Sequence, residues 1–222
     1  GGSASSGSPA EVAMTLACTI HGKRDLRLQD ETPPALGPQD VLLGLGAGGI
    51  CGSDLHYYQE GRVGAFVVRE PLIPGHEASG IVQAIGSGVS RVKPGDRVAI
   101  NPSHPCGHCD YCRGGRGNLC RSMFFLGSAS VFPHAQGMFR ERFVMGEAQL
   151  TPITEPGISL GEIACAEPLS TQARGATGPA RRAGVALRAA QQALSNGRGA
   201  GHAGTPRNGL GPAASVVPLG GK

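Results

Sequence analysis

The sequence is poor in aromatic residues and in charge. Of its 222 residues only 4% are aromatic and 16% are charged, and Trp is absent. Long apolar runs are also missing: the longest uncharged apolar stretch, residues 41–52, contains five glycines and is shorter than the roughly 20 residues that a membrane span needs. Residues 1–12 lack the basic and apolar regions of a secretory signal. We therefore expect a cytoplasmic protein that does not enter a membrane, with residues 1–12 disordered.

The charged and aromatic residues that are present are distributed unevenly along the chain. No acidic residue follows Glu167, and no aromatic residue follows Phe143. Residues 168–222 carry seven basic residues, whereas residues 1–167 carry 13 basic and 16 acidic ones, so the net charge of +4 arises in the C-terminal segment. We therefore predict no nucleic-acid partner. Salt-dependent binding of nucleic acid by this basic segment is the alternative.

Within the basic segment, residues 171–222 have an unusual composition. They contain twelve Ala and eleven Gly, and no Ile, aromatic or acidic residue. We interpret them either as a disordered tail or as a shifted reading frame of GC-rich coding sequence. Gly199–Gly204 fits the G-x-G-x-x-G pattern of dinucleotide-binding loops, but no strand precedes it, Pro206 follows it, and no acidic residue lies downstream. We interpret that match as chance and assign no nucleotide-binding residues.

Residues 13–170 have the pattern of an all-β domain. Short runs with β-type composition are separated by turns rich in Gly and Pro, such as residues 93–96. The runs are residues 13–20, 25–29, 41–45, 79–85 and 97–101. Few segments have a helical period, although residues 158–165 are expected to begin a helix, with Ser159 as the N-cap and Glu162 three residues later. The sequence predicts a mainly β, barrel-like core.

Four of the seven cysteines are grouped at spacings typical of a metal site. The cluster is C-x2-C-x2-C-x7-C, formed by Cys106, Cys109, Cys112 and Cys120. Four thiolates at these spacings are able to surround one zinc ion, and such a closed site stabilises a loop without taking part in chemistry. Bacterial iron–sulfur motifs also open with C-x2-C-x2-C, but their next Cys follows three residues later and precedes Pro. We predict structural zinc.

Three further segments together offer a second set of metal ligands. Cys51 follows an apolar run, His76 and Glu77 follow a Pro-Gly turn, and Glu167 precedes Pro168. Each is weak evidence alone, but sulfur, nitrogen and carboxylate oxygen together are the ligands of a catalytic zinc that keeps one open position. Such a zinc lowers the pKa of a substrate hydroxyl, whose proton needs a route to solvent. Ser53 and His56 are suited to that relay.

Asp54 lies between these two residues and has two possible roles. A carboxylate beside a metal-binding histidine orients its ring. Asp and Ser at such positions also cap ordinary turns, and the spacing alone does not distinguish the two interpretations.

These segments resemble the zinc-dependent medium-chain dehydrogenase/reductase family. The resemblance is carried by GGICGSDLHYYQEGRVGAF, PLIPGHEASG, VKPGDRVAINPSHPCGHCDYC, FFLGSASVFPHAQGMF and AEPLS, and it covers residues 13–170. Within the family these runs are most similar to the polyol dehydrogenase branch, and there to its L-idonate-oxidising group.

The resemblance implies a GroES-like β-barrel catalytic domain and two zinc ions per chain. It implies that Cys51, His76 and Glu77 hold the catalytic zinc, with Glu167 at the fourth position directly or through water. It places Ser53 and His56 in the proton relay. The structural zinc is assigned by the resemblance to the four-cysteine cluster.

The resemblance also implies a reaction, and it implies that a nucleotide-binding domain belongs to the complete family fold. The reaction is oxidation of a secondary hydroxyl of a sugar acid or polyol, L-idonate to 5-keto-D-gluconate, with hydride passing to NAD or NADP. Family members are typically homo-oligomeric, and a Rossmann domain binds the nucleotide. In this chain the Rossmann domain is expected to be missing or disrupted. The alternatives are a catalytically silent zinc-binding fragment, or an enzyme specific for sorbitol or another polyol.

Overall fold

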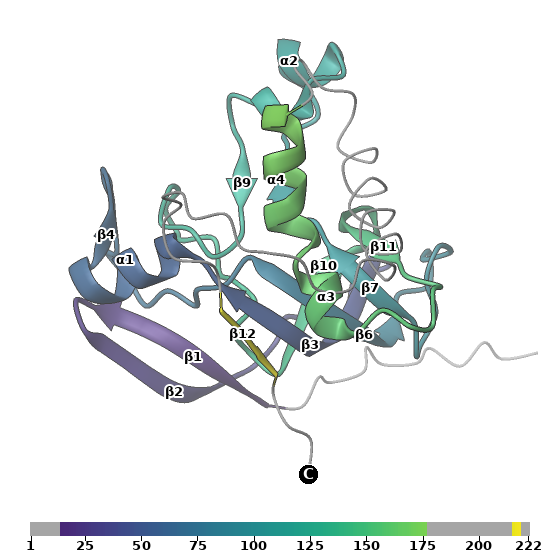
Figure 1. Ribbon diagram of the computed structural model, residues 1–222, viewed down its shortest axis with the longest axis horizontal. Helices are drawn as coiled ribbons and strands as arrows, with labels where there is room; N and C mark the ends of the chain where they lie inside the picture. The colour runs from purple at the N-terminus through teal and green to yellow at the C-terminus, as the bar shows by residue number, and fades with distance from the viewer. Residues whose placement is uncertain (1–13, 177–214, 219–222) are drawn as a thin grey trace, which may run out of the picture.

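The computed structural model describes residues 14–176 and 215–218 (Figure 1). The described part is mainly β, as predicted, and all its strand pairs are antiparallel. Its central sheet has the order β10-β3-β6-β7-β11, with β12 also paired to β3. The bounds are β3 Asp40–Ile50, β6 Glu77–Ile85, β7 Arg97–Ile100, β10 Arg142–Gly146, β11 Leu150–Pro152 and β12 Ser215–Pro218.

Three two-stranded sheets and several short helices surround the central sheet. The strand pairs are β1 Thr15–Gly22 with β2 Asp25–Glu31, β4 Arg62–Val63 with β5 Phe66–Val67, and β8 Ser103–His104 with β9 Phe124–Phe125. The helices are α1 Gly52–Glu60, α2 Asp110–Arg113, α3 Leu160–Ala164 and α4 Ala166–Ala176, with 3-10 turns η1 Gly117–Leu119 and η2 Glu147–Gln149. None of the helices described here is long and apolar enough to cross a membrane.

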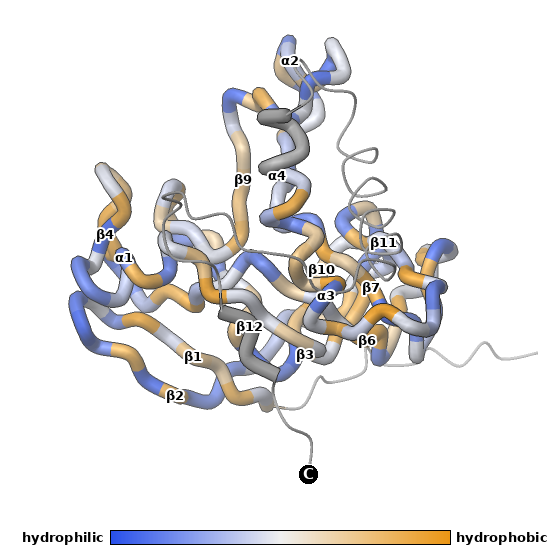
Figure 2. Tube along the Cα trace, in the orientation of Figure 1, coloured by the Kyte–Doolittle hydropathy of each residue, from blue (hydrophilic) through white to orange (hydrophobic). Residues whose placement is uncertain are grey.

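The main hydrophobic core lies on the central sheet, where apolar residues recur along β3, β6, β7 and β10 (Figure 2). Phe143 of β10 faces Leu43 of β3 in register, and both are fully buried. Directly opposite side chains in an antiparallel pair pack on one another, and burying a side chain of this size contributes about 1.5–3 kcal/mol. This core holds β3 and β6 in the register that later positions the site.

The predicted strands and turns lie where the sequence places them, but helices α1, α2 and α4 and the strands β4, β5 and β8–β12 were not predicted. The turn at residues 93–96 forms, with Gly95 at φ 93°. The N-cap of α3 is as predicted: Ser159 Oγ accepts from the Glu162 N–H at 3.2 Å, and the Glu162 carboxylate accepts from the Ser159 N–H at 2.7 Å. Helix α1 was not predicted, because it buries only Asp54 and Tyr57 and so lacks an apolar stripe.

The C-terminal part of the described structure extends beyond the expected boundary. Helix α4 continues past Ser170 to Ala176, so the predicted domain limit falls inside a helix. Residues 215–218, within the predicted tail, pair with residues 47–50 of β3. The predicted disorder of residues 1–12, most of the tail, and the Gly199–Gly204 match lie outside the described residues.

Candidate metal centres

The pairing of β3 with β6 brings two distant segments to one place. Gly49 of β3 lies opposite Glu77, the first residue of β6. Cys51 directly follows β3 and His76 directly precedes β6, so the register places both beside Glu77. The candidate ligand atoms of Cys51, His76 and Glu77 all lie within 4.8 Å of one another. We call this group the pocket.

The backbone around the pocket leaves room for these side chains only because two residues are glycine. A Cβ on Gly49 would collide with the Glu77 carboxylate. Gly75 has φ 94°, which favours glycine, and a Cβ there would collide with the Phe139 ring. The segment is fixed by backbone hydrogen bonds from Met138 to the carbonyl of Gly75 (3.0 Å) and from Phe139 to that of Pro74 (3.1 Å). His76 and Glu77 are therefore presented by a rigid turn.

The charges in the pocket fit a bound cation. Burial alone lowers the pKa of His76, but the hydrogen bond with Cys51 and the negative charge of Asp54 outweigh it and raise that pKa to about 9. The neighbouring His76 lowers the pKa of the Cys51 thiol, whereas burial raises the pKa of Glu77. A thiolate, an imidazole and a carboxylate gathered in this way fit a zinc ion.

Asp54 connects the two ligand segments. Its carboxylate accepts hydrogen bonds from the N–H of Cys51 at 2.9 Å and from the N–H of Gly75 at 3.2 Å. Its Oδ1 lies 3.9 Å from His76 Nδ1, which is a close charge contact but too long for a hydrogen bond. Asp54 therefore caps the start of α1, and its charge lies beside the His76 ring without a hydrogen bond to it, so of the two roles considered from the sequence only the capping role is formed.

The two predicted relay residues both lie on α1, three residues apart and so on neighbouring positions of one helix face. Ser53 is half-buried, and its polar groups beside the Cys51 sulfur help to lower the pKa of that thiol. His56 is not part of the pocket: its side chain is 59% exposed and its Nδ1 lies 3.3 Å from the Glu60 carboxylate. Ser53 thus lies at the inner end of the predicted relay and His56 at the solvent end.

Glu167 lies near the pocket but outside the group of three. It is the second residue of α4, is half-buried, and interacts electrostatically with both His76 and Glu77. Burial raises its pKa, while His76 lowers it. Its assignment to a fourth coordination position, direct or through water, stays a prediction.

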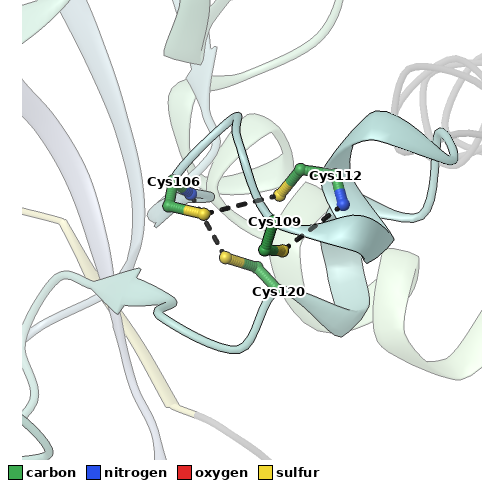
Figure 3. Close-up of side chains that lie close together, drawn as sticks. All are labelled: Cys106, Cys109, Cys112 and Cys120. Atoms are coloured by element: carbon green, nitrogen blue, oxygen red, sulfur yellow. Dashed lines mark hydrogen bonds between the residues drawn. The ribbon is translucent and has the colours of Figure 1, made fainter.

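The four cysteines form a separate lobe beyond β8 and β9, which we define as residues 106–120. Their sulfur atoms lie within 4.8 Å of one another, and the side chains point toward a common centre (Figure 3). The Cys106 N–H donates to Cys120 Sγ at 3.2 Å, and the Cys106 and Cys112 sulfurs are 4.0 Å apart. A tetrahedral zinc with bonds of about 2.3 Å needs sulfurs about 3.8 Å apart, so the cage fits the ion.

Charge and ring contacts hold the lobe closed around this cage. A backbone hydrogen bond from Arg121 lowers the pKa of Cys109 to about 6, while desolvation and the hydrogen bond with Cys109 raise that of Cys112 to about 12. The Arg121 guanidinium donates two bonds of 2.9 Å to Asp110 and stacks on Tyr111. A cation bound between the four sulfurs would stabilise all of them as thiolates, including that of Cys112, which favours a metal here.

Phe125 contacts the pocket and was not singled out from the sequence. Its ring lies 5.4 Å from that of His76, centroid to centroid, with an interplanar angle of 58°. Phe125 belongs to β9, beside the lobe, so no spacing rule relates it to His76. Only the folded arrangement could have identified it.

The sequence is similar to known dehydrogenases, in agreement with the two candidate metal centres. Residues 37–155 match the alcohol dehydrogenase GroES-like domain. The sequence is 42% identical to sorbitol dehydrogenase from Macaca fascicularis over 172 residues, which make up 78% of this chain and 46% of that protein.

Solved structures of dehydrogenases are also similar to this chain. L-idonate 5-dehydrogenase from Escherichia coli str. K-12 substr. MG1655 is similar with a TM-score of 0.67 and 40% identity, over 71% of this chain and 44% of that one. A protein from Sinorhizobium meliloti 1021, solved with NADP bound, gives a TM-score of 0.63 and 31% identity over 74% and 45%. The chain spans about half the length of the relatives that it matches. It belongs to the zinc-dependent medium-chain alcohol and polyol dehydrogenase family and covers the N-terminal, GroES-like part of that family's fold.

Proposed function

We propose that the protein oxidises a secondary hydroxyl of a sugar acid or polyol, with L-idonate as the first candidate substrate and NAD or NADP as the hydride acceptor. The observation that carries this proposal is the convergence of Cys51, His76 and Glu77 within 4.8 Å. L-idonate is favoured by the similarity to the E. coli L-idonate 5-dehydrogenase, while sorbitol is the alternative because of the sorbitol dehydrogenase relatives.

The chain's own residues have distinct tasks in this reaction. Cys51, His76 and Glu77 would hold the zinc, which supplies a Lewis acid that lowers the pKa of the substrate hydroxyl. Ser53, beside the Cys51 sulfur, accepts the hydroxyl proton and passes it along α1. His56 releases it, because the exposed side chain is in contact with water. Asp54 keeps the two ligand segments together through its bonds to Cys51 and Gly75.

The test is a steady-state assay on the whole protein with L-idonate, sorbitol and each nicotinamide. Reduction of the nicotinamide with L-idonate supports the proposal, and reduction with sorbitol alone contradicts the substrate. Ser53→Ala should lower kcat about 100-fold with little change in KM, because general acid–base steps contribute about 10²–10⁴-fold. Leu55→Ala, a change at an exposed residue of the same helix, is the matched control.

A catalytically silent zinc-binding fragment is the second candidate. It is the alternative interpretation of the sequence, in which no nucleotide-binding residues were assigned. Calorimetry of the 222-residue chain with NAD+ and NADP+ decides between the two. Saturable binding excludes the silent fragment, and absence of heat with either nucleotide supports it.

A further inference from the structure

The connection between the lobe and the pocket is a short pair of strands. β8 and β9 flank the lobe, pairing Ser103 with Phe125 and His104 with Phe124. The Leu126 N–H donates to the Pro102 carbonyl at 3.1 Å and extends the pairing by one step. Figure 1 shows β9 running between the central sheet and the region of α2. We call β8 and β9 the neck.

The lobe holds the two sides of the neck together. Cys106 follows β8 by two residues and Cys120 precedes β9 by four, and the Cys106 N–H donates to Cys120 Sγ at 3.2 Å. Two-residue strands are too short to stay paired by themselves. The register of the neck therefore depends on the closed cysteine cage.

The neck places one aromatic side chain on each face. Successive residues of a strand point in opposite directions. Phe124 is 41% exposed, whereas Phe125 is half-buried and lies with its ring 5.4 Å from the ring of His76. The two phenylalanines are therefore a natural matched pair: one contacts a pocket residue and the other faces solvent.

The His76 ring needs a contact such as that with Phe125 to fix its orientation. A metal-binding histidine is normally oriented by a hydrogen bond from its second nitrogen to a carboxylate or carbonyl. Here Nδ1 has no hydrogen-bond partner, and the nearest carboxylate oxygen, Oδ1 of Asp54, is 3.9 Å away. The ring of Phe125 supplies a restraint that the hydrogen bonds do not.

We propose that the four-cysteine lobe acts on the pocket through Phe125: the closed lobe fixes the neck, and the neck holds the Phe125 ring against His76 in the orientation that binds metal. Phe125 is thus a positioning residue, and the lobe is a part of the pocket's metal affinity as well as a stabiliser of its own loop. This inference rests on the pocket being a metal site, as proposed above.

The first experiment measures the pocket directly, without turnover. The full chain is titrated with Co²⁺ against a competing chelator, and its visible ligand-field spectrum is recorded; the spectrum of H76A, which retains only the lobe's ion, is subtracted. F125L should weaken Co²⁺ at the pocket about tenfold and change its spectrum, because groups that orient a ligand contribute 10–100-fold to metal affinity. F124L should leave both unchanged, and F125Y, which keeps the ring, should restore them.

The second experiment tests the origin of the effect. C120S opens the lobe, and its effect on pocket affinity is measured with and without F125L. If the lobe acts through Phe125, C120S weakens the pocket several-fold in the parent chain but adds little in F125L. Equal losses in both backgrounds would show that the lobe acts by another route and would overturn the coupling.

The outcomes separate this inference from the proposed function. A parent chain that binds no Co²⁺ at the pocket contradicts the metal site itself. A parent chain that binds it, with F125L equal to the parent in affinity and spectrum, contradicts only the role of Phe125. The comparison of F125L with F124L leaves every lobe ligand intact, so it decides the point even if C120S fails to fold.

Discussion

The lobe and the pocket offer similar ligands but are assembled in opposite ways. The four cysteines of the lobe lie within residues 106–120, whereas Cys51 and His76 are separated by 25 positions. No residue from 103 to 125 belongs to the buried apolar core. The pocket, in contrast, lies at the ends of two core strands, β3 and β6, with His76 and Glu77 buried.

This difference determines what each metal contributes. A segment without a core of its own needs a crosslink to stay folded, so the lobe depends on its ion for stability. The pocket is fixed by the packing of the sheet and does not need an ion to keep its shape. The lobe metal is expected to stabilise structure, and the pocket metal to serve chemistry.

The largest expected effect is on the lobe. Cys106→Ser should lower the free energy of unfolding by about 4 kcal/mol, the stabilisation that a ligand provides at a thousand times its Kd. Thermal unfolding with and without added zinc measures this loss. Cys165→Ser, a change of a cysteine that belongs to neither cluster, is the control. If Cys106→Ser unfolded at the temperature of the parent chain, the lobe would not depend on metal.

Removal of a pocket ligand should change the metal content more than it changes the stability. His76→Ala should reduce the metal content from two ions per chain to one and lower the unfolding temperature less than Cys106→Ser does, because the sheet holds the pocket. Metal analysis after dialysis, paired with circular dichroism, measures both quantities. His104→Ala, at an exposed histidine of β8, should keep two ions. Two ions in His76→Ala would contradict the ligand assignment.

A smaller effect is expected from a change that adds a single methyl group. Gly49→Ala pushes the Glu77 carboxylate aside and should weaken zinc at the pocket about 10–100-fold, the range seen when the support of a ligand is lost. Gly44→Ala in the same strand meets only the flexible end of Gln83 and should leave affinity unchanged. Competition with a chelator measures both variants, and equal affinities would show that Glu77 is not held where the structure places it.

Per pH unit, the smallest effect is the dependence of pocket affinity on pH. The raised pKa of His76, about 9, means that metal must displace a proton at pH 7, so pocket affinity should rise by up to about tenfold per pH unit between pH 7 and 9. In the metal-free chain the pH dependence of folding stability has the opposite sign, because stability falls as the pH rises. The stability that protonated His76 contributes is complete below pH about 6.5 and is lost as the pH rises toward 9. Titration at several pH values, with an indicator of proton release, tests this, and a flat profile contradicts it.

The sequence by itself determined the lobe, the β character and the positions of five strands, β1, β2, β3, β6 and β7. The four cysteines are close along the chain, and short runs bounded by Gly and Pro are local signals, so neither needs knowledge of distant contacts. The cap of α3 by Ser159 and Glu162 was predictable for the same reason. Helix α1 was not, because it buries only two residues and lacks the periodic apolar stripe that marks a helix.

Only the tertiary structure decided how the pocket is built. The residues of the pocket could be named from their chemistry and from family resemblance, but their approach depends on the register of β3 against β6, in which Gly49 faces Glu77. The contact of Phe125 with His76 depends on a second pairing, of β8 with β9. Register is fixed by packing across the whole sheet, so no local pattern contains it.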